Sequence, residues 1–361
     1  MDKLNIFNGK RVLVTGDTGF KGSWLCMWLM KLGADVHGIS LEPQDKSDNF
    51  NICYLGNKMH HMYCDVRYKD LVSAVVSDIN PEIIFHLAAQ PIVLSSFEDP
   101  AYTIDTNVMG TVNLLEAARK LDSVKSIVVV TSDKCYRSSN SVNESLVESD
   151  PLGGKDPYSA SKACEDIIAT SYYESFFKHR GVGLSTARAG NVIGGGDRQK
   201  NRIVPDCIRA IENSSEMEIR NPSHIRPWQY VLDSLYGYIK LASVMYNNPH
   251  RYSGAWNFGP NVESHISVGA LVNKIIECLP ANIEKPAIKV NINNTSDGDK
   301  ETKILSLDPS KSSNVLGFRN VLLIDDVVGF TVEDYFTDKI PYDQRMERIS
   351  TFEKLTGENW S

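Results

Sequence analysis

The stretch Thr15-Gly16-Asp17-Thr18-Gly19-Phe20-Lys21-Gly22 decides the fold, because it joins a short apolar strand to a helix through three glycines. The run before it, 11–14, is typical of a buried strand, and 24–32 has a helical pattern. Glycines spaced three apart permit a tight turn, close approach of the backbone to a pyrophosphate, and close packing of helix on strand. The first N–H groups of the helix then face the anion. The stretch predicts a dinucleotide-binding turn.

Strand and helix patterns continue to alternate outward from this turn. Strands are expected at 35–39, 83–86 and 126–130, and helices at 71–78 and 111–121. Such alternation predicts parallel βαβ units with right-handed crossovers. The strands are apolar throughout, as expected when helices cover both faces of a sheet. The predicted fold class is therefore α/β, a Rossmann-type doubly wound parallel sheet.

The pattern loosens after about residue 190, where Gly, Pro and Asn accumulate in 190–197. We expect a Rossmann domain over 1–190 and a smaller C-terminal lobe for substrate, built mainly from 191–361. A helical pattern at 231–246 and a short strand pattern at 256–258 suggest that the chain returns to the first domain around 225–260.

The end of the second strand indicates which dinucleotide binds. An acidic residue that grips the adenine ribose normally stands roughly 20 residues after the glycines. Ser40 occupies that position here, and Glu42 comes later. No Arg nearby would take an extra 2′-phosphate, which favours NAD over NADP. Asp65 and Val66 are expected to flank the adenine, and a plain loop Asp is an equally good interpretation.

Composition excludes several classes of protein. The net charge of -7 argues against a nucleic-acid-binding face. Seven cysteines, an odd number without a C-x-x-C pair, indicate neither a disulfide framework nor a zinc site. The apolar run 24–30 is too short to span a bilayer, and the first residues show no signal-peptide core. We therefore expect a cytoplasmic protein without a metal, a membrane or a nucleic acid as partner.

A reactive pair is expected on a later helix, where Tyr158 and Lys162 are four residues apart and share a face. A lysine ammonium beside a phenol stabilises the phenolate, which can then act as a base. The Y-x-x-x-K pattern alone occurs often by chance. Its combination with the glycine turn and with the polar strand end Ser132-Asp133-Lys134 makes chance a poor explanation.

At these positions the chain resembles the extended short-chain dehydrogenase/reductase family. The motifs that match are 15–22, 86–89, Asn107, the strand ending at Ser132, and Tyr158 with Lys162. Over roughly residues 8 to 320 the chain is most similar to the CDP-glucose 4,6-dehydratases of that family. This closer likeness rests on the segments 15–25, 88–91, 106–111, 131–136, 188–197 and 225–231.

The resemblance implies NAD as cofactor, a nucleotide-sugar substrate and a homodimer. It also implies oxidation at C4 of the sugar, elimination of water across C5 and C6, and return of the hydride to C6. In that scheme Tyr158 takes the proton of the 4-hydroxyl while Ser132 hydrogen-bonds it. Asp133 protonates the departing 6-hydroxyl, and Lys134 removes the C5 proton. Related dehydratases usually have Glu at the position of Lys134, and a lysine base must be neutral.

Further contacts follow from the glycine turn and the resemblance. Residues expected to bind the cofactor are Gly16, Thr18, Gly19, Phe20, Lys21, Gly22, Ser40, Asp65, Val66, Leu87, Ala88, Ala89, Gln90, Asn107, Tyr158 and Lys162. Residues expected to bind the substrate are Gln90, Ser132, Asn191, Arg202 and Arg226. Arg226 suits bidentate phosphate binding, and Asn107 is expected to brace the active-site lysine unless it is a surface residue.

Three functions stay open at this point. The first is a 4,6-dehydratase of CDP-glucose or of another nucleotide hexose. A sugar-nucleotide epimerase or reductase would share Tyr158, Lys162 and NAD, but would leave Asp133 and Lys134 idle. A protein that binds NAD without turnover would commonly lose the tyrosine.

Overall fold

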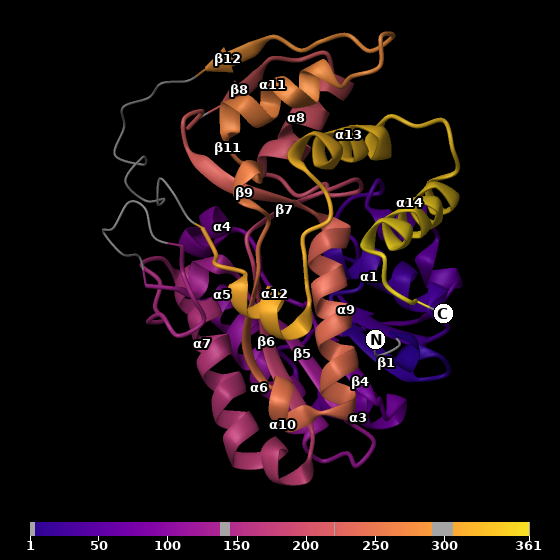
Figure 1. Cartoon of the computed structure of the whole chain (residues 1–361), viewed down its shortest axis with the longest axis vertical. Helices are drawn as coiled ribbons and strands as arrows, with labels where there is room; N and C mark the ends of the chain where they lie inside the picture. Colours follow the sequence, from indigo (N-terminus) through magenta and orange to yellow (C-terminus); the bar gives the residue numbers. More distant parts are fainter. Residues whose placement is uncertain (1–3, 138–144, 220, 291–305, 361) are drawn as a thin grey trace.

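The computed structural model describes residues 4–137, 145–219, 221–290 and 306–360. In this part of the chain seven strands form one parallel sheet, in the order β10-β6-β5-β4-β1-β2-β3, in the lower half of Figure 1. The strands are β1 (Arg11–Thr15), β2 (Asp35–Ser40), β3 (His60–Tyr63), β4 (Ile83–His86), β5 (Ser126–Val130), β6 (Gly183–Ala189) and β10 (Gly254–Phe258). This arrangement confirms the predicted fold class.

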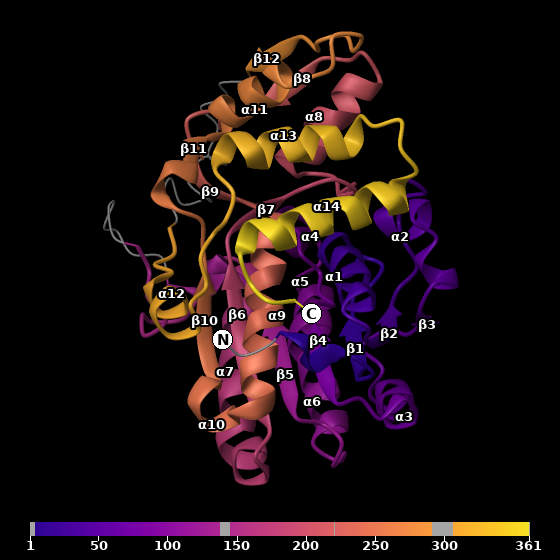
Figure 2. The same cartoon turned by 45° about the vertical axis from the view of Figure 1, so that its right-hand side comes forward.

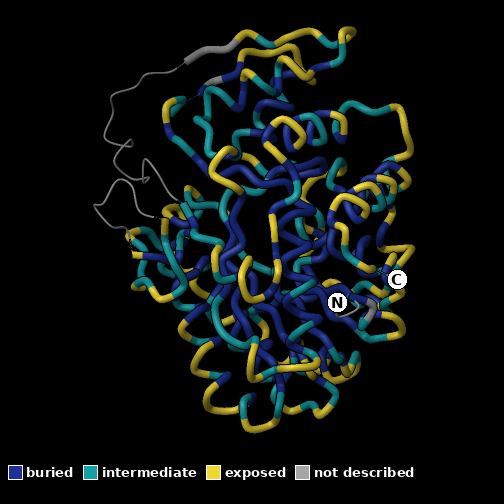
Figure 3. Tube along the Cα trace, in the orientation of Figure 1, coloured by how far each residue is buried: buried dark blue, intermediate teal, exposed yellow. Residues whose placement is uncertain are grey.

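Helices cover both faces of the sheet, and alternate strand residues point into the two resulting cores. Val12 and Val14 of β1 belong to the core beneath α1 and α9, whereas Leu13 belongs to the core beneath α3, α6 and α7. Figure 3 shows the buried trace at the centre of the molecule. The helices are α1 (Phe20–Lys31), α9 (Val231–Asn247), α3 (Lys69–Ile79), α6 (Gly110–Ala118) and α7 (Pro157–Tyr172).

The sequence analysis does not predict two of the sheet strands, β3 and β6. β3 lies at the edge of the sheet and is largely exposed, so it has no apolar run. β6 is buried throughout but contains Ser185, Thr186 and Arg188, which hide its strand pattern. Their polar groups are satisfied by partners from distant parts of the chain.

A second, smaller group of elements lies above the carboxyl ends of the sheet strands (Figures 1 and 2). In it β11, β9 and β7 form a sheet, and β12 pairs with β8. Its elements are β7 (Asn191–Ile193), α8 (Ile203–Glu212), β8 (Met217–Ile219), β9 (Ile225–Tyr230), β11 (His265–Ser267), α11 (Val268–Glu277), β12 (Ile288–Val290) and α13 (Ile324–Tyr335).

Segments after residue 230 also belong to the lower layers. α9 packs on β5 and β6, β10 extends the sheet beside β6, and α14 packs on α1. The exact division into domains stays a prediction. The remaining helices are α2 (Asn49–Ile52), α4 (Val93–Glu98), α5 (Pro100–Ile104), α10 (Pro249–Tyr252), α12 (Ser310–Leu316) and α14 (Pro341–Thr356).

Candidate active site

A cavity of about 940 Å³ lies between the sheet and the smaller group of elements. Its floor comes from the residues that directly follow β1, β4, β5 and β6, which is where open α/β sheets bind ligands. All residues predicted to contact cofactor or substrate line it, with one exception, Asn107. The cavity is as large as the larger ligand sites of proteins.

The glycine turn forms one wall of this cavity and leaves no room for side chains. Gly16 has φ +76°, and a Cβ there would lie 2.8 Å from the backbone nitrogen of Ala88. A Cβ on Gly22 would lie 2.0 Å from the carbonyl oxygen of Gly16. The Gly19 N–H donates to that same carbonyl at 3.0 Å and closes the turn just before α1. At these glycines only backbone faces the cavity, which allows the close approach that a pyrophosphate requires.

Ser40 ends β2 beside this turn. Its hydroxyl lies 2.6 Å from that of Thr18, which donates to the carbonyl of Leu41 at 3.0 Å. Because the Thr18 proton is used in that bond, Ser40 donates to Thr18 and keeps its lone pairs for a ligand hydroxyl. Asp65, also at the cavity wall, is held by Arg67 at 2.6 Å.

Asp17 belongs to the glycine turn, but its side chain points away from the cavity. Its Oδ2 lies 2.6 Å from Nδ1 of His61 beneath the turn, where Asp17 is fully buried. Burial raises the pKa of Asp17, although His61 opposes this. Asp17 thus packs the turn against β3 and does not itself contact a ligand.

The polar end of β5 presents Ser132, expected to hold the 4-hydroxyl, and Asp133 and Lys134, expected to carry out the elimination. Ser132 caps the short helix η4 (Asp133–Cys135), accepting from the Lys134 N–H at 3.3 Å. Its hydroxyl donates to Oδ1 of Asp133 at 2.9 Å. Asp133 is 1% exposed, and its Oδ2 has no hydrogen-bond partner among the described residues. The Lys134 ammonium nitrogen lies 3.9 Å from Asp133 Oδ1, and this side chain is 27% exposed.

Helix α7 brings the reactive pair to the same cavity. Asp156 caps its first turn by accepting from the Ser159 N–H at 2.9 Å, and Pro157 occupies the first helical position. Tyr158 and Lys162 are both buried and both line the cavity. Lys162 Nζ donates to the carbonyl of Val130, the last residue of β5, at 3.3 Å. This contact fixes the lysine beside the strand end.

Glu165 is a neighbour of the reactive pair that the sequence analysis missed. Lys162 Nζ lies 3.0 Å from each of its carboxylate oxygens, and Glu165 is 1% exposed. Burial raises the pKa of Glu165 to about 7, although Lys162 opposes this. Burial alone would lower the pKa of Lys162, but Glu165, Tyr158 and Asp166 together outweigh it and the pKa lies above its ordinary value. The lysine is therefore a cation at neutral pH.

Asn107 and His86 lie below the cavity floor and support it. Asn107 accepts from the Gln90 N–H at 2.7 Å and donates to the hydroxyl of Ser161 at 2.8 Å. Among the described residues its side-chain hydrogen bonds go to the Gln90 loop and α7, and none goes to the active-site lysine. His86 lies between the hydroxyls of Thr15 and Thr111 at 2.7 and 3.0 Å. Burial lowers the pKa of His86 to about 3, so this histidine is uncharged at neutral pH and serves to pack the floor of the cavity.

Positive charge gathers where substrate is expected. Arg202 precedes α8 and binds Asp197 at 2.9 Å, while Arg226 of β9 donates to the carbonyl of Ile225. Burial, followed by the charges of Arg202 and Lys162, lowers the pKa of Lys21 to about 7. A bound diphosphate would relieve this repulsion. Asn191 adds a buried Oδ1 without a hydrogen-bond partner in the described chain.

The family model described as GDP-mannose 4,6 dehydratase matches residues 13–330. The chain belongs to this family. Its members are sugar-nucleotide 4,6-dehydratases, which are NAD-dependent hydro-lyases, and the glycine turn described above fits that cofactor. No helix in the described part of the chain has the length and apolar character needed to cross a lipid bilayer.

Several curated dehydratases resemble the chain. The CDP-glucose 4,6-dehydratase of Salmonella typhimurium is 45% identical over 277 residues, which are 75% of this chain and 77% of that protein. The GDP-mannose 4,6-dehydratase of Vibrio cholerae is 32% identical over 46% of each chain. A dTDP-D-glucose 4,6-dehydratase of Dictyostelium discoideum is 29% identical over 62% of this chain and 53% of that protein.

Solved structures share the fold at lower identity. The UDP-glucose 4-epimerase of Thermotoga maritima has a TM-score of 0.75 at 21% identity, over 89% of this chain and 97% of that one. The dTDP-glucose 4,6-dehydratase DesIV of Streptomyces venezuelae, solved with NAD bound, has a TM-score of 0.74 at 22% identity. That match covers 95% of this chain and 99% of DesIV. The epimerase and the dehydratase therefore share this architecture.

Proposed function

We propose that this family member converts CDP-glucose to CDP-4-keto-6-deoxyglucose with NAD as its bound cofactor. The observation that carries the proposal is the shared cavity of two pairs, Tyr158 with Lys162 and Asp133 with Lys134. The first pair suits oxidation of an alcohol, and the second supplies the acid and base that elimination needs. The choice of CDP-glucose is supported by the 45% identity to the Salmonella enzyme.

The order of events follows from the groups present. Tyr158, stabilised as phenolate by Lys162, takes the proton of the 4-hydroxyl, and Ser132 holds that oxygen. Bound NAD would take the hydride from C4 and later return it to C6. The C4 ketone acidifies the C5 hydrogen, so that Lys134, as a neutral amine, can remove it as a proton. The buried Oδ2 of Asp133 carries the proton that leaves with the 6-hydroxyl as water.

A substrate panel tests the specificity. We expect the purified protein to turn over CDP-glucose with a higher kcat/KM than the GDP-, UDP- and dTDP-hexoses. A higher value for another nucleotide would replace CDP-glucose while leaving a 4,6-dehydratase in place.

Turnover in D₂O tests the reaction itself. A dehydratase yields a product that has lost water and gained one deuterium at C5, which mass spectrometry detects. A product of unchanged composition would indicate an epimerase, and unaltered substrate would indicate NAD binding without turnover.

Lys134→Ala isolates the elimination step. We expect the variant to reduce the nicotinamide upon addition of substrate, seen as a rise in near-ultraviolet absorbance, without releasing a dehydrated product. Lys200→Ala, at an exposed lysine that does not line the cavity, is the matched control and should behave as wild type. Normal dehydration by the Lys134 variant would contradict the role proposed for that residue.

A further inference from the structure

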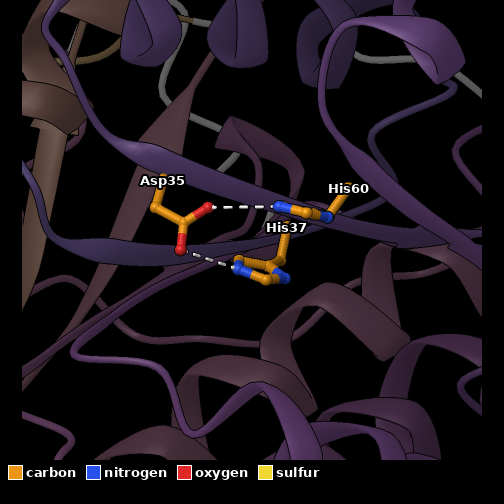
Figure 4. Close-up of side chains that lie close together, drawn as sticks. All are labelled: Asp35, His37 and His60. Carbon is orange, nitrogen blue, oxygen red and sulfur yellow. Dashed lines mark ion pairs between the residues drawn. The ribbon is translucent and has the colours of Figure 1, made fainter.

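Three side chains with metal-binding atoms converge at the end of the sheet opposite to the cavity. Asp35 and His37 lie two residues apart on β2 and so share a face, and His60 of β3 is the register partner of His37. Figure 4 shows the two imidazole rings one above the other, each with a nitrogen toward the Asp35 carboxylate. β3 is the edge strand, so the group joins it to its only neighbour in the described sheet.

The separations in this group match those between metal ligands and are longer than those of strong charge-assisted hydrogen bonds. His37 Nε2 lies 3.2 Å from Asp35 Oδ2, and His60 Nε2 lies 3.6 Å from Oδ1. Hydrogen bonds between such groups are about 2.7–2.9 Å long. Ligand atoms around a tetrahedral zinc ion, with bonds of about 2.0–2.1 Å, are about 3.3 Å apart.

The two histidine nitrogens are also close enough to each other to share one ion. The three ligand atoms all lie within 4.8 Å of one another, and the rings are stacked with centroids 4.6 Å apart. Because the two imidazole rings are stacked, the lone pairs of their nitrogens do not point at one common position, and one ring must rotate to bind a shared ion. The His60 side chain is 72% exposed, so it can rotate toward His37 without disturbing the core.

A second observation points to an ion at this place. His37 Nε2 is buried, and although Asp35 Oδ2 lies 3.2 Å away it makes no hydrogen bond with any described residue. Buried polar atoms without partners are rare in folded proteins, and an ion is one of the few things that satisfies them. A cation between His37 and Asp35 would occupy that nitrogen directly.

We propose that Asp35, His37 and His60 bind one divalent transition-metal cation of the zinc type, with water completing its coordination. Two imidazoles and one carboxylate suit zinc, cobalt, nickel or copper and disfavour magnesium and calcium, which prefer oxygen ligands. The ion clamps the edge strand β3 to β2. It takes no part in the chemistry, because Ser40, at the cavity end of β2, lies about 16 Å from Asp35 along the strand.

Cobalt binding by the full-length, reduced protein tests the proposal, since Co²⁺ has visible absorption bands that depend on its ligands. We expect one Co²⁺ per chain, displaced by Zn²⁺, and a Tm that rises with Zn²⁺ but not with Mg²⁺. Asp35→Asn and His60→Gln should abolish the bands and the Tm rise, and these exposed positions tolerate substitution. His250→Gln, an exposed histidine on α10, is the matched control and should keep both.

Two results would overturn the proposal. One is the absence of cobalt bands and of any Tm change in wild type. The other is equal binding by wild type, Asp35→Asn and His60→Gln, which would assign the ion to other ligands such as the exposed thiol of Cys278. Dehydratase turnover is read separately, and it should be the same with and without a chelator.

Discussion

Two consecutive carboxylates of α7 are both buried beside a cation, and their surroundings differ. Asp166 receives three contacts from the guanidinium of Arg188 as well as the hydroxyls of Thr131 and Thr186. Within the described part of the chain, Glu165 receives only the ammonium of Lys162. Both oxygens of Asp166 are thus saturated by rigid donors that join α7, β5 and β6.

The pair Arg188–Asp166 is structural, whereas the pair Lys162–Glu165 includes the lysine of the active site. A buried pair is stable only when further hydrogen bonds offset the loss of hydration, and Asp166 meets that condition. Glu165 does not, so burial raises the pKa of Glu165 to about 7. The carboxylate next to the reactive lysine can therefore change its charge in the physiological range, whereas Asp166 ties α7 to β6 through its donors.

The largest effect is expected on the cavity side of α7, with Tyr158→Phe. Without the phenol there is no base for the 4-hydroxyl, so kcat should fall about 10³-fold. NAD binding and the free energy of unfolding should stay near wild type, because the ring still fills its place. Substantial turnover by this variant would remove Tyr158 from the reaction.

Asp166→Asn tests the structural side of the same helix. The substitution leaves the buried guanidinium of Arg188 without a counter-charge, which costs about 3–5 kcal/mol. Urea unfolding should show this loss, with kcat per folded molecule nearly unchanged. A loss below about 1 kcal/mol, the usual range for exposed pairs, would show that the Asp166–Arg188 pair does not stabilise the fold in the way proposed here.

Asp233 of α9 extends the comparison, because it is a buried carboxylate that pairs with no cation among the described residues. One oxygen accepts from the Val321 N–H at 2.6 Å, and burial raises the pKa of Asp233 to about 8. The folded state therefore holds a proton that the unfolded chain releases near pH 4. Binding of this proton stabilises the folded state. The stabilisation is complete below pH 4 and is lost as the pH rises from 4 through 8.

Asp233→Asn keeps the acceptor for Val321 and removes the titration. Relative to wild type, the free energy of unfolding of the variant should improve by up to about 1.4 kcal/mol for each pH unit between pH 5 and 7. Parallel stability curves for the two proteins over that range would show that Asp233 does not take up the proton.

The smallest effect is expected for Glu165→Gln. Above pH 7 the ionised Glu165 shares the charge of Lys162, which leaves the Tyr158 phenolate less stabilised. In the variant the rise of kcat/KM with pH should begin about one pH unit lower, and the two profiles should converge below pH 7. A shift to higher pH would mean instead that Glu165 is needed to position the lysine.

The sequence predicts those features whose signal is local. The glycine turn, the spacing of Tyr158 and Lys162, and five of the sheet strands follow from neighbouring residues alone. β6 and Glu165 do not, since their polar groups have partners that only the folded chain brings close. A glutamate three residues from a lysine on a helix looks like an ordinary surface pair, and nothing local shows that both are buried.

The place of β10 in the sheet has a consequence for how the protein is made. β6 gains its outer neighbour only when β10 pairs with it, Gly254 against Ser185, after residues 190–253 have been synthesised. Until then a growing chain carries an open strand edge, which is a template for pairing with other chains. Slow translation of 190–253 would lengthen that exposure, so the yield of native enzyme should depend on the speed of synthesis and on chaperones that shield the edge of β6.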